Sequence, residues 1–373
     1  MHLPVAGLYV HVPFRRTARP TDDGYTVVTD ASDFSRFETA LCRELRYYAR
    51  AYAPEERMST VYAGGGRPSL LPLSSVHAVL TTLVDAFDAS AFEEATAEVT
   101  PADATRRYLH GLKRMGFDRL SLPILSFFPK TLRDLKAPHS IAEAMRARRV
   151  ARETGFAVSV DLLFGGPEQT LDTWEATLRL AVEMDISHVT ITEASAGEDE
   201  GKRADMLELA MTFLQSEGYE QYELTHFARP GHRSTHQENY YAHGNYLGIG
   251  PSAQSFWWPN RAQAPRARRW TNVRDVERYA QLLRQRYPPV TYRETLNRST
   301  LAEEYVLLRL RTAAGLDLDR LKEHYGVNLR TQKTDVLARL RDEGLIHDDP
   351  DTVRLTLRGR LVTDAITQRL LPA

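Results

Sequence analysis

Histidine and aromatic residues gather between residues 219 and 270 of this chain, together with several arginines. Imidazole is a common protein ligand for iron, aromatic side chains pack well on flat ligands, and guanidinium groups pair with carboxylates. These residue types are equally typical of a hydrogen-bonded surface loop under an aromatic lid. The histidines are His226, His232, His236 and His243; the aromatic residues are Tyr240, Tyr241, Trp257, Trp258 and Trp270; the arginines are Arg261, Arg266, Arg268 and Arg269.

A second chemical signal is the run Gly64-Gly65-Gly66-Arg67-Pro68-Ser69, which follows a short apolar segment. Successive glycines let the backbone adopt positive φ and approach a ligand closely. Taken alone, such a run is also typical of a tight turn without a ligand.

The elements that position these residues follow a repeated strand–helix pattern over the first two thirds of the chain. Apolar runs predict strands over 7–12, 59–63, 94–99, 119–122, 157–164 and 188–193, and helical periodicity predicts helices near 33–52, 74–87, 102–115, 141–154 and 171–184. Such long crossovers suit parallel strands, so we expect helices around a parallel sheet, open or curled into a barrel. The working face of such a sheet is the carboxyl end of its strands, where the glycine run would lie.

The pattern changes after about residue 230. Residues 231–272 show no clear period and are expected to form an ordered loop region or small sheet over the barrel mouth, followed by a helical pattern over 273–286. Helices over 299–311, 317–325 and 329–343, a hairpin turning at 348–352 and a final helix from Gly359 predict a winged-helix-like unit. The third helix interleaves Arg330, Lys333, Arg339 and Arg341 with Asp335 and Asp342, so no nucleic-acid partner is expected.

Residues 9–22 read YVHVPFRRTARPTD. This opening resembles the radical-SAM coproporphyrinogen oxidase and HemW heme-chaperone group. In that group a similar sequence leads into the motif C-x3-C-x2-C, whose three thiolates hold a 4Fe-4S cluster. Here those positions carry Arg15, Arg19 and Asp22. A guanidinium has no lone pair to offer iron, and one carboxylate cannot replace three sulfurs. Cys42 is the single cysteine and is expected to be a small buried residue of a helix, so the sequence predicts neither cluster nor radical chemistry.

Other family motifs support the resemblance and show where the chain departs from it. The glycine run resembles GGGTPS, which contacts the methionine end of S-adenosylmethionine, with Arg67 in place of the threonine. RLSLPILSF at 119–127 resembles RLSLGVQSF, with Leu125 in place of a ligand-contacting glutamine, and Ala137 replaces a ligand-binding arginine. These replacements at ligand-contacting positions predict that S-adenosylmethionine is not bound tightly. The vestigial cofactor positions that it implies are Gly64, Gly65, Gly66, Glu98 and Asp161.

A second resemblance covers the downstream half. YEQYELTHFARP at 219–230 is similar to YEQYEISNFARPG, and the following stretch partly matches G-x-x-S-x-H-N-x-x-Y-W, the region associated with heme binding in the chaperone branch. The resemblance implies heme contact by His236, Tyr240 and Tyr241, with His236 as the leading candidate ligand of heme iron and His226, His232 and His243 as substitutes. LRLRTAAGLDLDRL at 308–321 and LTLRGRLVTDAI at 355–366 resemble the C-terminal domain of the same group.

Composition sets limits on the remaining function classes. The chain has 373 residues, 42% of them hydrophobic, and a net charge of −1, so it can bury a sizeable core in about two domains but has no general attraction for polyanions. No apolar run approaches the roughly 20 residues of a membrane span, so no integral membrane segment is expected. The first residues lack signal-peptide features, and a cytoplasmic protein is expected.

These observations predict a partial (β/α)6 TIM-like radical-SAM barrel over 1–230, an aromatic and basic cover segment over 231–290, and a small winged-helix-like C-terminal domain over 298–373. The leading functional hypothesis is a heme- or porphyrin-binding, chaperone-type protein without radical catalysis. The alternative is a regulatory pseudoenzyme that binds a protein partner and no tetrapyrrole. A third hypothesis is a residual enzyme in which Arg15 and Arg19 bind an anion near Glu98 and Asp161.

Overall fold

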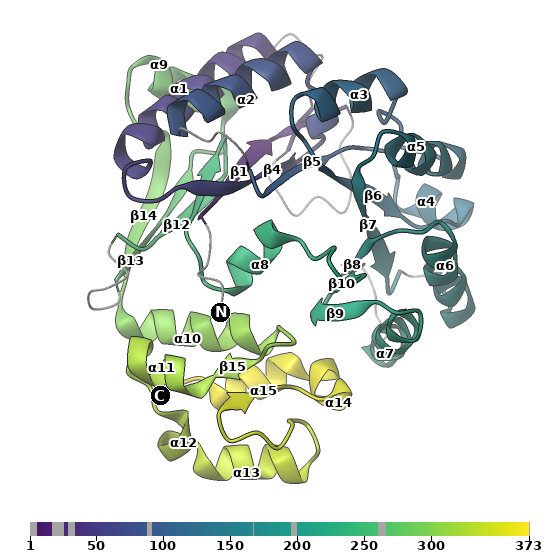
Figure 1. The fold of residues 1–373 in the computed structure, drawn as a ribbon, viewed down its shortest axis with the longest axis vertical. Helices are drawn as coiled ribbons and strands as arrows, with labels where there is room; N and C mark the ends of the chain where they lie inside the picture. The colour runs from purple at the N-terminus through teal and green to yellow at the C-terminus, as the bar shows by residue number, and fades with distance from the viewer. Residues whose placement is uncertain are drawn as a thin grey trace.

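The structure of the chain, a computed structural model, describes residues 6–16, 26–28, 34–87, 92–166, 168–194, 200–259 and 266–372. The six segments expected as strands all form strands of one sheet (Figure 1). They are β1 (Ala6–Val12), β4 (Met58–Gly65), β5 (Glu94–Glu98), β6 (Arg119–Leu125), β7 (Ala157–Phe164) and β8 (His188–Glu193). Each pairs in parallel with the next in chain order, so the predicted α/β fold with a parallel sheet is confirmed.

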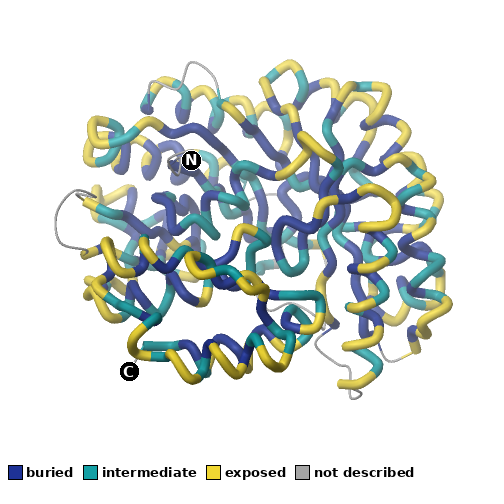
Figure 2. The backbone as a smooth tube through the Cα atoms, turned by 60° about the horizontal axis from the view of Figure 1, so that its bottom comes forward, coloured by how far each residue is buried: buried dark blue, intermediate teal, exposed yellow. Residues whose placement is uncertain are grey.

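Helices cover the outer face of this sheet because each presents one apolar side to it. On α1, for example, the periodic residues Phe37, Leu41, Leu45 and Tyr48 are all buried. Figure 2 shows buried residues in the interior of the molecule and exposed residues around its outside. No helix in the described ranges is long and apolar enough to cross a membrane. The helices of this part are α1 (Phe34–Tyr52), α2 (Leu73–Phe87), α3 (Arg106–Arg114), α4 (Pro129–Asp134), α5 (Ile141–Glu153), α6 (Leu171–Glu183) and α7 (Glu200–Ser216).

Helix ends follow local capping chemistry, which explains where the sequence-based bounds were off. α3 begins at Arg106 and not at 102, because the Thr105 side chain accepts a hydrogen bond from Tyr108 N. α4 and α7 were not expected. α4 is a short helix that starts at a proline, and α7 buries only a narrow stripe around Met206, Ala210 and Leu214.

Residues 231–290 do not form a separate cover over the barrel mouth. They extend the sheet beyond β1, where β11 (Tyr246–Ile249) is parallel to β1, and β12 (Gln254–Trp257), β13 (Ala267–Asn272) and β14 (Val290–Leu296) follow in antiparallel order. β9 (Glu220–Glu223) and β10 (His226–Ala228) add to the other edge. The 12-stranded sheet therefore spans most of the chain, with α9 (Val276–Arg284) packed near α1.

The C-terminal unit has its own hydrophobic core and resembles the predicted arrangement of helices and a hairpin. The helix expected over 329–343 is broken at Lys333 into two pieces. The unit docks on the side of α7, α8 (Thr235–Tyr241) and β9, where Leu224 N donates to Arg311 O. Its elements are α10 (Arg298–Leu310), β15 (Leu316–Asp317), α11 (Leu318–Tyr325), α12 (Leu329–Gln332), α13 (Thr334–Asp342), β16 (Thr352–Val353), α14 (Leu357–Leu361) and α15 (Thr363–Leu370).

Candidate ligand-binding site

A cavity of about 340 Å³ lies between helix α8 and the carboxyl ends of β1, β4 and β5, a volume within the range of small-molecule and cofactor sites. Residues Arg15, Gly65 and Glu98, the last residues of β2 (Phe14–Arg15), β4 and β5, form one side, which we call the rim. His236, Gln237 and Tyr240 of α8 form the opposite side, which we call the floor. The remaining lining residues are Tyr9, His11, Thr26 and Tyr62. The cavity thus brings part of the glycine run close to part of the histidine- and tyrosine-rich segment that the sequence analysis singled out.

The glycine run closes β4 against β1 at the rim. Gly65 has φ +116°, and a Cβ there would lie 2.7 Å from Nδ1 of His11. Gly66 N donates to Val12 O at 2.8 Å, and a Cβ on Gly66 would lie 2.7 Å from Phe14 O. Strand packing alone therefore requires glycine at both positions, and of the run only Gly65 reaches the cavity lining.

Two positions that differ from the family pattern, Arg67 and Leu125, make structural contacts outside the cavity. The Arg67 guanidinium donates two hydrogen bonds of 2.6 Å to the Asp103 carboxylate, which also accepts a 2.6 Å hydrogen bond from the Ser69 hydroxyl. This cation is turned toward Asp103 and does not line the cavity. Leu125 packs against a small apolar cluster of Leu135, Leu163 and Ala194.

Of the residues at the positions of the cluster cysteines, the structure describes one. Arg15 lies at the rim, whereas Arg19 and Asp22 lie outside the described residues. Cys42 is buried between α1 and α2, as predicted, with its sulfur 3.4 Å from Thr82 Oγ1. In the parts of the chain that the structure describes, no group of three or more His, Cys, Asp or Glu side chains could hold a metal ion. A 4Fe-4S cluster does not fit this donor set.

A buried carboxylate fixes the floor. Glu94, the first residue of β5, is 5% exposed and accepts hydrogen bonds from the Ser234 hydroxyl at 2.7 Å and from the backbone N–H groups of Thr235 at 2.9 Å and His236 at 3.3 Å. Ser234 in turn caps α8 by accepting from Gln237 N. Sequence reasoning missed Glu94. The feature that could have identified Glu94 is that a charged side chain begins a strand whose other residues were expected to be buried.

His236 lies at the centre of the floor. Its Nδ1 is 2.8 Å from Thr60 Oγ1, its Nε2 is 3.0 Å from the Tyr240 hydroxyl, and its ring stacks on Tyr62. Burial lowers the pKa of His236 to about 3, so the imidazole is neutral at physiological pH. A neutral imidazole is the form that binds iron, but coordination here would replace the hydrogen bond to Thr60 or to Tyr240.

The wall between floor and rim carries two phenols and a second imidazole. The Tyr9 hydroxyl lies 3.1 Å from His11 Nδ1. Burial, assisted by the Glu98 carboxylate, raises the pKa of both Tyr9 and Tyr62 above the ordinary range, so both remain phenols. His11 was not singled out from the sequence, although its spacing of two from Tyr9 on a strand places both on one face of the sheet.

Asp161 and Tyr241 do not line this cavity. Asp161 accepts a 3.1 Å hydrogen bond from the Ser121 hydroxyl inside the barrel, and burial raises its pKa. Tyr241 lies beside His226 in a cluster around Glu223, which also binds Arg311 Nε at 2.7 Å. Burial would raise the pKa of Glu223, but His226 and Arg311 hold it at about 2. This cluster fastens the C-terminal unit to β9.

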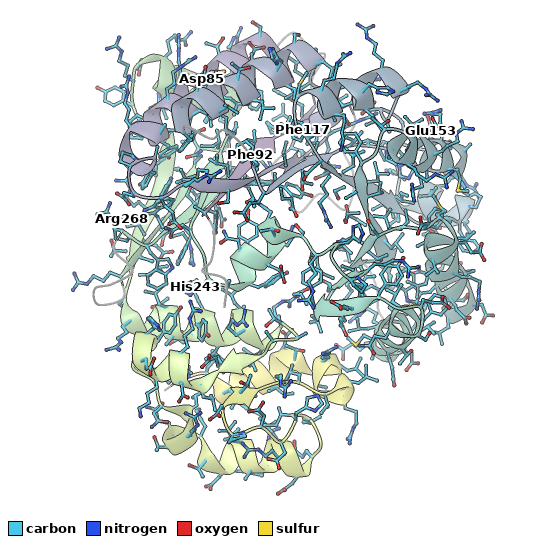
Figure 3. The ribbon with its side chains drawn as sticks, in the orientation of Figure 1. Asp85, Phe92, Phe117, Glu153, His243 and Arg268 are labelled. Carbon is cyan, nitrogen blue, oxygen red and sulfur yellow. The ribbon has the colours of Figure 1, made fainter. Side chains whose placement is uncertain are left out.

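The tryptophans expected to cover a ligand are elsewhere. Trp257 and Trp270 are buried in the sheet extension, where Trp270 Nε1 donates to the Tyr48 hydroxyl at 2.8 Å. On β13, Trp270 is buried, whereas Arg268 is exposed and lies at the outer edge of the molecule (Figure 3). Arg269 pairs with Glu304 at 2.7 Å, Arg266 is exposed, and Arg261 lies outside the described residues.

The other candidate histidines are also not in the cavity lining. His232 is exposed, and His226 lies 2.7 Å from Glu223. His243 lies between α8 and the C-terminal helices (Figure 3), where its ring stacks on Phe256 and its Nδ1 is 3.0 Å from the Tyr325 hydroxyl. Of the four candidates, the structure therefore brings only His236 to the cavity.

Comparisons with known proteins cover nearly the whole chain. Residues 28–181 match the family model of the Radical SAM superfamily, and residues 296–362 match that of the HemN C-terminal domain. The heme chaperone HemW of Mycobacterium tuberculosis (strain ATCC 25618 / H37Rv) is 31% identical over 386 residues, 98% of this chain and 94% of the relative. That of Bacillus subtilis (strain 168) is 27% identical over 96% of this chain and 97% of the relative. The solved structure of coproporphyrinogen III oxidase (HemN) from Escherichia coli has the same fold, with a TM-score of 0.84 at 22% identity over 99% of this chain and 90% of that one.

Proposed function

This chain belongs to the HemW family of the radical SAM superfamily, and from that premise we propose that it is a heme-binding, chaperone-type protein that works without a 4Fe-4S cluster and without radical chemistry. The relatives named as heme chaperones support the heme part of the proposal. The replacement of a cluster cysteine by Arg15 and the burial of Cys42 support the absence of the cluster.

One observation carries the proposal: the cavity gathers two imidazoles, three phenols and one guanidinium in a single space. Heme presents a flat apolar ring, an iron atom and two carboxylates, and these groups match aromatic, imidazole and guanidinium side chains respectively. When bound, heme would supply an iron centre that prefers imidazole nitrogen.

The residues of the chain have distinct roles in this proposal. His236 and His11 are the candidate iron ligands, and both are held in place by hydrogen bonds, to Thr60 and Tyr9 respectively. Tyr62 and Tyr240 offer ring surfaces on either side of His236. A chaperone must release its cargo, and an imidazole that exchanges a hydrogen bond of 2.8–3.0 Å for the iron atom can recover that bond on release.

A hemin titration followed by the Soret band tests the proposal. We expect a saturable one-to-one shift for the wild-type protein and for the control variant His232→Ala, whose side chain is exposed. The shift should change position or be lost in His236→Ala or His11→Ala. An unsaturable response of the wild-type protein would remove heme binding and leave the protein-binding pseudoenzyme as the account to pursue, by capture of partners on the immobilised chain. Unchanged spectra in both variants would move the heme site out of this cavity.

A further inference from the structure

Arg15 is, among the described residues that line the cavity, the one that carries a permanent positive charge. We propose that its guanidinium pairs with a propionate carboxylate of heme and so selects and orients the ligand, with the carboxylates at the rim and the macrocycle toward the floor. This inference deepens the function proposed above and rests on it.

The position of Arg15 is built into the fold. It ends β2, where the preceding residue Phe14 is fully buried and packs on Phe37 with ring centroids 4.9 Å apart. β2 pairs in parallel with β3 (Val27–Val28), and Val27 N donates to Pro13 O at 2.7 Å. Because neighbouring residues of a strand face opposite sides, the burial of Phe14 directs Arg15 to the cavity.

The charges of the lining favour a carboxylate at this one place. A carboxylate that leaves water needs charged or hydrogen-bonding partners, and the planar guanidinium matches its two oxygens. His236 is neutral and Tyr9 and Tyr62 remain uncharged phenols, so none of these three groups offers a positive charge to pair with the anion.

The Glu98 carboxylate, in the same lining, disfavours a second carboxylate close to it. Its carboxylate acts on Tyr9 and Tyr62, which places its negative charge beside the aromatic wall. A propionate near that wall would be repelled, whereas the neutral macrocycle would not. The two charged groups therefore favour one orientation of the ligand over the flipped one.

The experiment compares hemin with hemin dimethyl ester, which has the same macrocycle and iron but no carboxylates. Affinities are measured for the wild-type protein, Arg15→Gln, Arg15→Lys and the control Arg43→Gln, which removes an exposed arginine from α1. Loss of a charge-assisted pair should weaken hemin binding by Arg15→Gln roughly ten- to a hundredfold. Binding of the ester should be unchanged, and Arg15→Lys should be intermediate because the charge is kept and the fork is lost.

Three results would overturn the inference. They are equal affinity of the wild-type protein for hemin and its ester, an unchanged hemin affinity in Arg15→Gln, and an equal loss for both ligands in that variant, which would indicate a structural effect. Wild-type protein that binds neither ligand would instead remove the proposed function, and this inference with it. Far-ultraviolet circular dichroism of Arg15→Lys and Arg15→Gln checks that each variant is folded.

Discussion

The floor and the rim of the cavity differ in how firmly the fold dictates their residues. On the floor, His236 uses both ring nitrogens, and Glu94 satisfies three donors around the start of α8. At the rim, the position that holds a cluster thiolate in the family carries Arg15, next to Phe14, which packs on Phe37.

The difference separates two kinds of functional residue. A residue that serves the geometry is held from several directions, so its replacement costs folding free energy. A residue whose one role is to ligate a cofactor, such as an iron–sulfur cluster, makes no contact that the fold requires once that cofactor is absent. Arg67 shows a third outcome, because it replaces the threonine of the family pattern and forms a largely buried ion pair with Asp103.

The largest expected contrast is at the rim. After anaerobic incubation with iron and sulfide, the wild-type protein should show no 4Fe-4S absorption or electron paramagnetic resonance signal, because it lacks the thiolates. The triple variant Arg15→Cys, Arg19→Cys, Asp22→Cys supplies three and is the matched comparison. A 4Fe-4S signal from the wild-type protein would contradict the view that the rim has lost its cofactor ligands while the floor keeps its structure.

At the floor, Glu94→Ala should lower the free energy of unfolding by about 3–5 kcal/mol, because three buried donors lose their acceptor. Urea denaturation followed by circular dichroism measures the change. Glu94→Gln keeps one acceptor oxygen and should lose less. A cost below about 1 kcal/mol for the alanine variant would mean that α8 is held by its other contacts.

Arg67→Ala should cost about 2–3 kcal/mol in unfolding free energy, because it leaves the Asp103 carboxylate in a largely buried place with the Ser69 hydroxyl but without its cation. The control is Arg36→Ala, which breaks an exposed pair with Glu277 and should cost less than about 0.5 kcal/mol. Equal costs in urea denaturation would show that Arg67 has no structural role beyond that of a surface arginine.

The smallest effect concerns the pH dependence of the floor. The pKa of His236 is about 3 in the folded chain and roughly 6.5 when unfolded, so the unfolded chain gains the proton first as the pH falls. Unfolding free energy should therefore drop below pH 6.5, with His236 contributing up to about 1.4 kcal/mol per pH unit. His236→Asn should remove that part of the slope while His188, whose pKa burial also lowers, keeps its own. Parallel curves for the two proteins would contradict the burial of His236.

Much of the fold could be predicted because its signals are local. Short apolar runs marked all six parallel strands, and periodic residues such as Phe37 and Leu41 marked α1 and the burial of Cys42. The sheet extension could not be predicted in the same way. The run Arg268-Arg269-Trp270 has no alternation of polar and apolar residues that would mark one face as the core, so Trp270 was considered for a ligand although it is buried in the sheet.

The sequence by itself determined which family pattern this protein follows and which cysteines of that pattern are replaced, because thiolates, glycines and strand periodicity are properties of residue type and spacing. Only the tertiary structure decided which residues meet. Glu94 and His236 are separated by 142 residues, yet their hydrogen bond helps to set the floor of the cavity. His11 joins His236 there, while Tyr241 and the tryptophans do not, because side-chain direction depends on packing that no local pattern encodes.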